Sequence, residues 1–397
     1  MVQDWLWELL RGTGKLFGNP LFYYLFFLAG VLGVLRVKRE RRNFHIRIQD
    51  AYFELRQLLP LGIVLGLVTS IIGIAAGLVI PLGAVLLFTL FTFLWSVTTK
   101  VRLISPVYIV GATFFAMIFA AGQTLPIPLF SKTFTSLDEK IYPAIGILLA
   151  LLLIVEGILI IRNGSVATSP KLVKSKRGQW VGIHEAKRLW AVPLFLLIPE
   201  GTLSLPFDWW PMFSIGGDNY SLLLVPFAIG FHQQVQAQLP KEAIQLLGKR
   251  VTTLGVFTLL LATIGYWIPV ATIIVVALAM IGRETLTLRQ RLSEESMPFY
   301  FSKKNQGVMI LGILPDSPAH KMALQVGELI TKVNGTVVYN ESEFYEALQR
   351  NRAHCKLEVI DVYGQIRFVQ RALYEGEHHE LGVLFVVDEN KWETEVV

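Results

Sequence analysis

The sequence is poor in charge and in cysteine. Only 17% of its 397 residues are Asp, Glu, Lys or Arg, whereas 53% are hydrophobic. Soluble domains are about a quarter charged, so a large part of this chain is predicted to lie in a lipid bilayer. The single cysteine, Cys355, excludes an intramolecular disulfide, which fits a reducing compartment.

Motifs of common enzymes are missing as well. A zinc peptidase of the His-Glu-x-x-His type needs a second histidine four residues after the first, but His184-Glu185 is followed by Arg188 at that position. The sequence contains neither a Gly-x-Ser-x-Gly nucleophile elbow nor a Walker-type phosphate loop. We therefore predict no catalytic residues, no metal site and no cofactor, in a protein that is not an enzyme.

Long apolar runs, in contrast, are abundant. A membrane-spanning helix needs about 20 mostly apolar residues. The candidates are Leu21–Val37, Leu58–Ile80, Leu82–Val97, Ile104–Ala121, Tyr142–Ile161, Trp190–Leu205 and Tyr220–Val235. The longer run Val251–Gly282 contains a Gly-Tyr-Trp-Ile-Pro segment and is interpreted as a hairpin of two helices. Residues 1–20 are expected to form either an amphipathic interfacial helix or a Trp-anchored lead into the first span, and both alternatives remain open.

Basic residues indicate the orientation of the chain. The segment RVKRERRNFHIR follows the first span at 36–47, and a second basic loop covers 162–188. Because cytoplasmic loops are rich in Lys and Arg, both are predicted to be cytoplasmic, with the N-terminus outside and about seven to nine helices in the membrane domain. The basic loops are expected to attract anionic lipid, and they do not indicate a nucleic-acid partner.

Two glutamates, Glu156 and Glu200, fall within apolar segments. Ionisable groups in the membrane suggest function by default, and a transporter places carboxylates at broken helices. The sequence has no internal repeat of the kind that many transporters show, so structural roles are favoured for both residues.

The pattern changes near Phe299, where short β-type runs replace the apolar segments. Ser317 followed by Pro318 predicts the start of a short helix. The pair Asn334-Gly335 predicts a hairpin turn, and Asn340 predicts the start of a second helix. The expected organisation is an N-terminal segment 1–20, a multi-span membrane domain 21–282, a cytoplasmic linker 283–298 and a small α+β domain 299–397.

Two motifs in this last part resemble the PDZ family. PDSPAHKMAL (315–324) is similar to the family pattern SPAxxAGL, and VGELITKVNG (326–335) is similar to GDxIxxVNG. Ala323 replaces the usual Gly, and Glu328 replaces the usual Asp. The resemblance implies a partly open barrel of five to six strands with two helices. PDZ domains bind a peptide, often a C-terminus, by adding it as a strand at a sheet edge.

The peptide groove is predicted to involve the last strand. No carboxylate-binding loop precedes Gly307, but ELGVLFV at 380–386 has the character of one, in a permuted arrangement. The predicted loop, accepting strand and helical wall comprise Leu381, Gly382, Val383, Leu384, Phe385, Phe344 and Leu348. The alternative, that this segment is only the last core strand, remains open.

The chain as a whole resembles the MinJ family of cell-division topological determinants, most clearly at residues 19–47 and in the PDZ segment. The resemblance implies a non-enzymatic scaffold of the cell membrane, at the division septum and poles, that links DivIVA-like and MinD-like proteins. Other divisome membrane proteins and a second copy of the chain are further candidate partners. A membrane transporter, or an accessory subunit of a membrane protease with a regulatory PDZ domain, remains the alternative.

Overall fold

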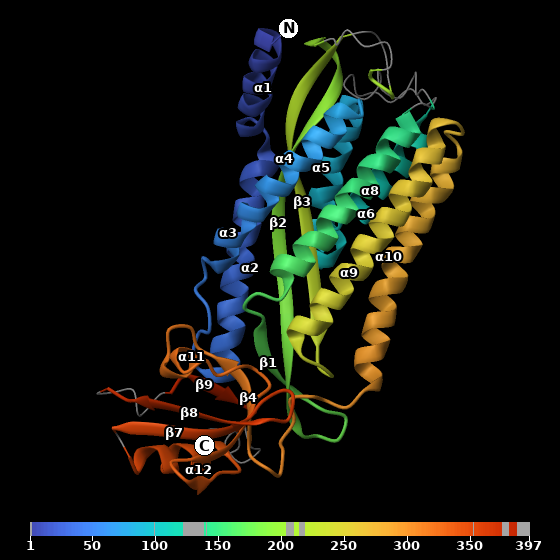
Figure 1. Cartoon of the computed structure of the whole chain (residues 1–397). Helices are drawn as coiled ribbons and strands as arrows, with labels where there is room; N and C mark the ends of the chain where they lie inside the picture. The colour runs from blue at the N-terminus through green and yellow to red at the C-terminus, as the bar shows by residue number, and fades with distance from the viewer. Residues whose placement is uncertain are drawn as a thin grey trace.

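The chain forms a long helical domain around a β-hairpin, followed by a small α+β domain at one end (Figure 1). The structure is a computed structural model that describes residues 2–98, 100–121, 139, 141–203, 210–213, 219–351, 353–374 and 381–386. The N-terminus lies at the end of the helical domain that is far from the C-terminal domain. The predicted fold class, a polytopic membrane domain followed by a small α+β domain, is confirmed.

Among the described residues, five helical segments are long and apolar enough to cross a membrane. They are Pro20–Phe44, Phe53–Ala75, Ile141–Gly164, Pro240–Tyr266 and Ala271–Ser296. The helices within them are α2 (Pro20–Phe44), α3 (Phe53–Leu58), α4 (Pro60–Ala75), α8 (Ile141–Leu159), α9 (Pro240–Thr263) and α10 (Ala271–Ser296). Two shorter apolar helices, α5 (Leu82–Val97) and α6 (Pro106–Ala120), pack into the same core. Several begin at a proline, whose missing N–H has no partner in the first turn anyway.

Two expected spans are strands instead of helices. Trp190–Leu205, as far as it is described, lies in β2 (Trp180–Leu203), and Tyr220–Val235 forms β3. The two strands pair antiparallel, with Pro193 opposite Pro226. Proline inside a helix removes a hydrogen bond and clashes with the preceding turn, whereas the outer edge of a two-stranded ribbon tolerates it. A third strand, β1 (Ser169–Lys174), pairs with the start of β2 next to the C-terminal domain (Figure 1).

The ribbon is covered by helices, as backbone within a membrane domain must be. Helix α4 lies along β2 through three small residues four positions apart, Gly62, Gly66 and Ser70. A Cβ atom on Gly62 would lie 2.1 Å from the Ala191 carbonyl oxygen. Ser70 Oγ accepts a hydrogen bond from the Phe195 N–H at 2.8 Å and thereby satisfies an edge donor of the ribbon.

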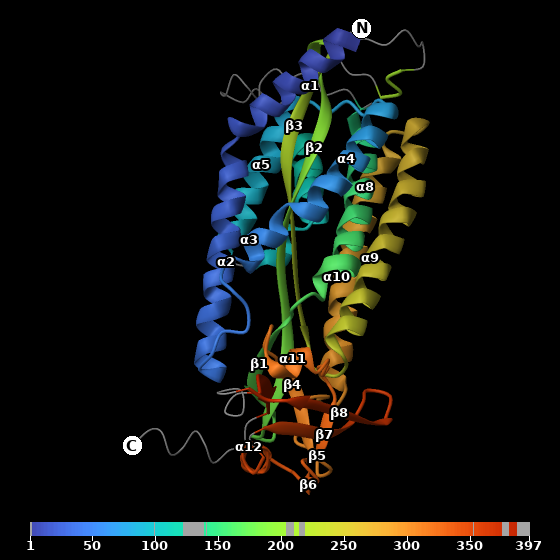
Figure 2. The same ribbon diagram turned by 60° about the vertical axis from the view of Figure 1, so that its left-hand side comes forward.

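Residues 251–282 form parts of two helices, as the hairpin interpretation predicted, with a turn between Thr263 and Ala271. Both helices are longer than that interpretation implied, because α9 begins at Pro240 and α10 ends at Ser296. Most of the predicted linker 283–298 is therefore helix. Helix α1 (Val2–Phe17) packs against β2 and β3, crossing their upper ends in Figure 2.

The C-terminal domain has the predicted secondary structure. Its strands are β4 (Val308–Ile313), β5 (Leu329–Val333), β6 (Thr336–Val337), β7 (His354–Ile360), β8 (Ile366–Ala372) and β9 (Val383–Phe385), and its helices are α11 (Pro318–Lys321) and α12 (Glu341–Gln349). The sheet order is β8-β7-β5-β4-β9, with β6 paired to β5. Ser317 and Asn340 accept from backbone N–H groups as N-caps, and Asn334-Gly335 has two positive φ angles, all as expected from the sequence.

Candidate peptide-binding site

Strand β9 ends the sheet on one side. It pairs antiparallel with β4, with Ile313 opposite Val383 and Ile310 opposite Phe385. Within the described strands its other edge has no neighbour. An edge strand presents backbone N–H and C=O groups that a further strand can pair with. The permuted arrangement predicted for this segment is therefore compatible with strand addition.

Gly382, at the start of β9, has the backbone conformation of a tight loop. Its φ of +80° is rarely adopted by residues with a side chain, and a Cβ atom there would lie 2.3 Å from Ser317 Cβ. Leu314 N–H donates to the Gly382 oxygen at 2.8 Å, and Ala319 N–H donates to the Leu381 oxygen at 2.9 Å. The loop is thus held against the first turn of α11.

Helix α12 packs beside β9. Phe344 and Leu348 are fully buried, and the Phe344 ring lies 5.0 Å from the Phe385 ring. Leu381 and Val383 belong to the same apolar cluster. A small cavity of about 20 Å³ lies where β9 ends beside the start of α12, and its lining includes Tyr339, Asn340, Glu341 and Val386. The structure therefore places β9 beside α12, with their apolar side chains buried in contact with each other.

Leu384 differs from its predicted neighbours. Side chains alternate between the two faces of a strand, and Leu384 lies over Gly312 on the face opposite Val383 and Phe385. A Cβ atom on Gly312 would also contact Pro170 of β1, so this face of β9 points toward the helical domain. Leu384 consequently contributes to the contact between domains.

Hydrogen bonds around His184 join the two domains. The His184 Nε2 atom lies 2.9 Å from the Leu311 carbonyl oxygen of β4, and Nδ1 lies 2.9 Å from Thr168 Oγ1. A carbonyl only accepts, so Nε2 carries the proton and the neutral Nδ1 accepts from the Thr168 hydroxyl. Burial lowers the pKa of His184 to about 4. Next to it, Gly182 N–H donates to the Phe301 oxygen at 2.8 Å.

An apolar cluster completes this contact. Its buried members from both domains are Leu172, Phe301, Met309, Leu311 and Leu329. Residues near Phe301 were predicted to begin the C-terminal domain, yet Phe301 forms a bridge with Gly182 of β2. The C-terminal domain is therefore docked on the helical domain.

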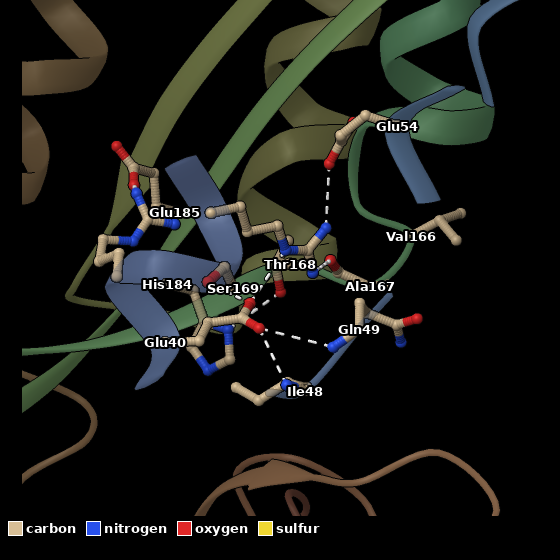
Figure 3. Close-up of polar contacts among 12 residues, drawn as sticks. Glu40, Ile48, Gln49, Glu54, Val166, Ala167, Thr168, Ser169, His184 and Glu185 are labelled. Atoms are coloured by element: carbon tan, nitrogen blue, oxygen red, sulfur yellow. Dashed lines mark hydrogen bonds and ion pairs between the residues drawn. The ribbon is translucent and has the colours of Figure 1, made fainter. Parts of the chain in front are cut away.

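A buried charge network anchors the same region (Figure 3). Arg36 donates to Glu40 at 2.9 Å and to Glu54 at 3.0 Å, and Arg188 also pairs with Glu54. Ser169 of β1 donates to Glu40 at 2.7 Å. All these charged side chains are at least nine-tenths buried. Paired charges of this kind hold α2, α3, β1 and β2 together, because removing one partner leaves the other uncompensated.

Sequence reasoning did not find this network. Arg36 and Glu40 are four residues apart on one helix, which is a recognisable signal, but they stand in a run of basic residues that indicates topology. In the sequence, Arg188 excludes a zinc motif and ends the basic loop 162–188, and neither pattern indicates a buried carboxylate partner. In the part of the chain that the structure describes, no three His, Cys, Asp or Glu residues are grouped to hold a metal ion.

Comparison with known proteins agrees with the architecture. The PDZ domain family model matches residues 309–361. With its apolar helices, the chain is thus a membrane protein that carries a PDZ domain, which implies binding of protein partners.

The whole chain has close relatives. It is 42% identical over 393 residues to "Cell division topological determinant MinJ" of Bacillus subtilis (strain 168), covering 98% of each chain. It is 24% identical to "Probable cell division topological determinant MinJ" of Lacticaseibacillus paracasei, over 94% of this chain and 97% of that one. The chain belongs to the MinJ family, and its function is that of a cell division topological determinant. No solved structure matches.

A third similarity is confined to the C-terminal domain. It is 32% identity over 66 residues to "Serine protease HTRA2, mitochondrial" of Drosophila ananassae, covering 17% of this chain and 15% of the protease. The MinJ relatives are named for division topology and not for an enzymatic activity.

Proposed function

We propose that this protein is a non-enzymatic membrane scaffold in bacterial cell division that links DivIVA-like proteins at poles and septum to MinD-like proteins. The 42% identity over nearly the full chain to a named topological determinant carries the proposal. The PDZ domain supplies a recognition element, and the helical domain supplies the membrane attachment. Other divisome membrane proteins are additional candidate partners, and anionic lipid is the candidate partner of the basic loops.

The contacts of Glu156 favour a scaffold over a transporter. Its carboxylate accepts from Arg283 at 2.8 Å and from Ser105 at 2.7 Å, so it is fully paired in the core of the helical domain. A transport site would require a group that exchanges partners. Glu200 lies in β2, but its side chain is outside the part that the structure describes.

The proposed orientation places the PDZ domain in the cytoplasm, because the basic end of α2 and the PDZ domain lie at the same end of the molecule (Figure 1). A fluorescent fusion tests the location. The full chain is expected at division septa and poles, and a chain without residues 299–397 is expected to lose part or all of this pattern. A uniform membrane signal for the full chain would overturn the division scaffold.

The groove between β9 and α12 is the proposed site for a partner segment. Support comes from the edge of β9 that pairs with no other described strand, from the loop at Gly382 and from the position of Phe344. Substitution Gly382→Val tests it, with Gly364→Val as the control. Gly364 has nearly the same φ, +82° against +80°, but a Cβ atom there meets nothing within 4 Å.

Gly382→Val is expected to abolish binding of purified DivIVA-type or MinD-type protein to the full chain, while Gly364→Val retains it. Thermal unfolding of both variants checks that they fold. As a test that needs no destabilising change, a photo-crosslinking residue in place of the half-exposed Tyr339 is expected to capture the partner. The same residue in place of Phe368, exposed on β8, is expected not to. Capture only at Phe368 would place the site on the other sheet edge.

A further inference from the structure

A polar cavity lies where α2 and α3 meet β1 and β2. Its volume is about 50 Å³, more than the roughly 10–15 Å³ that one water molecule needs. Figure 3 shows three of its lining residues, Glu54 of α3, Ser169 of β1 and Glu185 of β2. Cations outnumber carboxylates in its wall. The charged lining residues are Arg36, Arg39, Lys187 and Arg188 against Glu54 and Glu185.

The positive charge of this region is not fully compensated. Both carboxylates of the wall already form ion pairs with its arginines. Burial lowers the pKa of Lys187, the charge of Arg39 lowers it further, and no described carboxylate raises it. Lys171 on β1 is in the same situation, because burial and then Arg39 and Arg42 lower its pKa. Two half-buried lysines therefore stand beside Arg39 without a counter-ion in the described part of the chain.

Two N–H donors of the wall also lack an acceptor. The Nε atoms of Arg39 and Arg188 are buried and have no hydrogen-bond partner among the described residues. Arg188 is only 2% exposed, and an unmatched buried donor is destabilising, the more so on a charged group. Water can accept from such donors but does not offset the charge. A phosphate group does both, because its oxygens accept charge-assisted hydrogen bonds from Arg and Lys.

The position of the cavity indicates a membrane lipid as the source of the phosphate. Leu32 and Leu35 of α2 complete the wall, and Leu35 is 53% exposed on this candidate membrane-spanning helix. Arg36 follows directly, and most residues from there to Arg42 are charged. The change from apolar to basic residues marks the level of the lipid headgroups. A lipid can therefore place its phosphate in the cavity and its acyl chains along Leu35.

We propose that this cavity binds the phosphate group of an anionic membrane lipid, with Lys187 and the Nε atoms of Arg39 and Arg188 as donors. The proposal deepens the proposed attraction of the basic loops to anionic lipid, which by itself requires only exposed charge. The bound phosphate neutralises Lys187 and connects α2 to β2 at the cytoplasmic side of the membrane domain. The site does not involve β9 or α12, so its failure would leave the proposed peptide groove untouched.

Thermal unfolding of the full chain in a maltoside detergent, which contains no phosphate, tests the site. Short-chain phosphatidylglycerol is added in one series and inorganic phosphate in another. Phosphatidylglycerol is expected to raise the unfolding temperature of the parent at concentrations at which inorganic phosphate does not. Lys187→Gln is expected to need about ten times more of this lipid for the same rise, because a charged hydrogen bond is lost.

Lys176→Gln is the control, because it removes the same charge from an exposed position in the turn between β1 and β2. It is expected to keep the parent response to phosphatidylglycerol. Without lipid, Lys187→Gln is expected to unfold no lower than the parent, because it removes a cation that has no partner. A lower unfolding temperature would mean that Lys187 is compensated within the chain and would overturn the proposal.

The other outcomes separate the site from the loops and the lipid from free phosphate. Equal weakening by Lys176→Gln and Lys187→Gln would overturn the site and leave the diffuse attraction of the loops in place. An equal rise with inorganic phosphate, lost in Lys187→Gln, would assign the cavity to a free phosphate compound and overturn the lipid assignment. No response of the parent to phosphatidylglycerol would overturn both the site and the attraction of the loops.

Discussion

The pair Glu156–Arg283 is the clearest case of a residue whose role depends on its surroundings. Within an apolar helix, a glutamate suggests transport or proton transfer. Here its carboxylate is fully buried, and both of its oxygens are occupied by Arg283 and Ser105. The pair fixes α8 to α10, so the charge serves the packing of the helical domain.

Glu156→Ala is therefore expected to destabilise the helical domain by about 3–5 kcal/mol, because it leaves Arg283 buried without a counter-ion. Thermal unfolding in detergent measures the loss. Glu295→Ala is the control, since Glu295 forms an exposed pair with Arg291 on the same α10 helix and should have little effect. A double variant Glu156→Leu/Arg283→Met should recover much of the stability; if it is no better than the single variant, the pair contributes more than charge compensation.

His184 makes docking of the PDZ domain sensitive to acid. Its pKa is about 4 in the docked state against 6.5 when exposed, because burial disfavours the charged imidazole. The docked state therefore binds fewer protons, and docking is strongest above about pH 6.5 and weakens as the pH falls from there toward 4. Proteolysis of residues 297–307 as a function of pH measures this. His184→Gln should flatten the profile between pH 6.5 and 4, and an unchanged profile would assign the acid sensitivity to other groups.

At the scale of elements, the central β-ribbon is held by close contact with α4. Gly62 and Gly66 let the helix backbone approach the carbonyl oxygens of Ala191 and Pro193. Small residues at four-residue spacing permit the same approach between helices in membranes. In this protein the spacing serves a helix against a strand.

Gly62→Leu is expected to force α4 away from β2 and to destabilise the protein by about 1–3 kcal/mol or more, as overpacking does. Gly73→Leu, on the same helix, should have a small effect because a Cβ atom there meets only the Leu78 side chain at 3.9 Å. Unfolding temperature and yield in membranes compare the two variants. Similar losses for both would mean that the contact at Gly62 is not tight in the folded protein.

The elements that sequence reasoning predicted well are those defined by local signals. Ser317, Asn334-Gly335 and Asn340 each determine a cap or turn within a few residues, so the PDZ domain could be outlined in advance. Apolar runs of 16 residues do not distinguish a buried helix from a buried strand, and β2 and β3 were predicted as helices although Pro193 and Pro226 pointed the other way. The hydrogen bond from His184 to Leu311 and the ion pair between Arg188 and Glu54 join residues that are more than 100 positions apart in the sequence. No local sequence pattern shows such contacts.

At the scale of the whole molecule, all long elements run between two ends, with the N-terminus at one end and the PDZ domain at the other (Figure 2). Residues 210–213, beyond the far end of β2, lie at the N-terminal end, whereas the turn between β1 and β2 lies near the PDZ domain. In the proposed orientation, the N-terminal end therefore lies outside the cell and the PDZ end lies in the cytoplasm.

Accessibility to a membrane-impermeant thiol reagent tests that orientation in a Cys355→Ala background. Met212→Cys is expected to react in intact cells, because Met212 is half exposed at the N-terminal end. Arg177→Cys, in the turn between β1 and β2, is expected to react only after the membrane is opened. The reverse pattern would place the PDZ domain outside the cell.

The β2–β3 ribbon also constrains how the protein is made. A single extended strand in lipid leaves every backbone group without a partner, at a cost of several kcal/mol for each. Helices can enter the bilayer one at a time, but these two strands cannot. β2 must therefore pair with β3 before the two strands enter the membrane. The paired hairpin must then enter a space that α4 and its neighbours have already formed, where the helices cover its outer edges. Biogenesis of this protein is accordingly expected to include a late step in which a β-hairpin is inserted among helices synthesised before it.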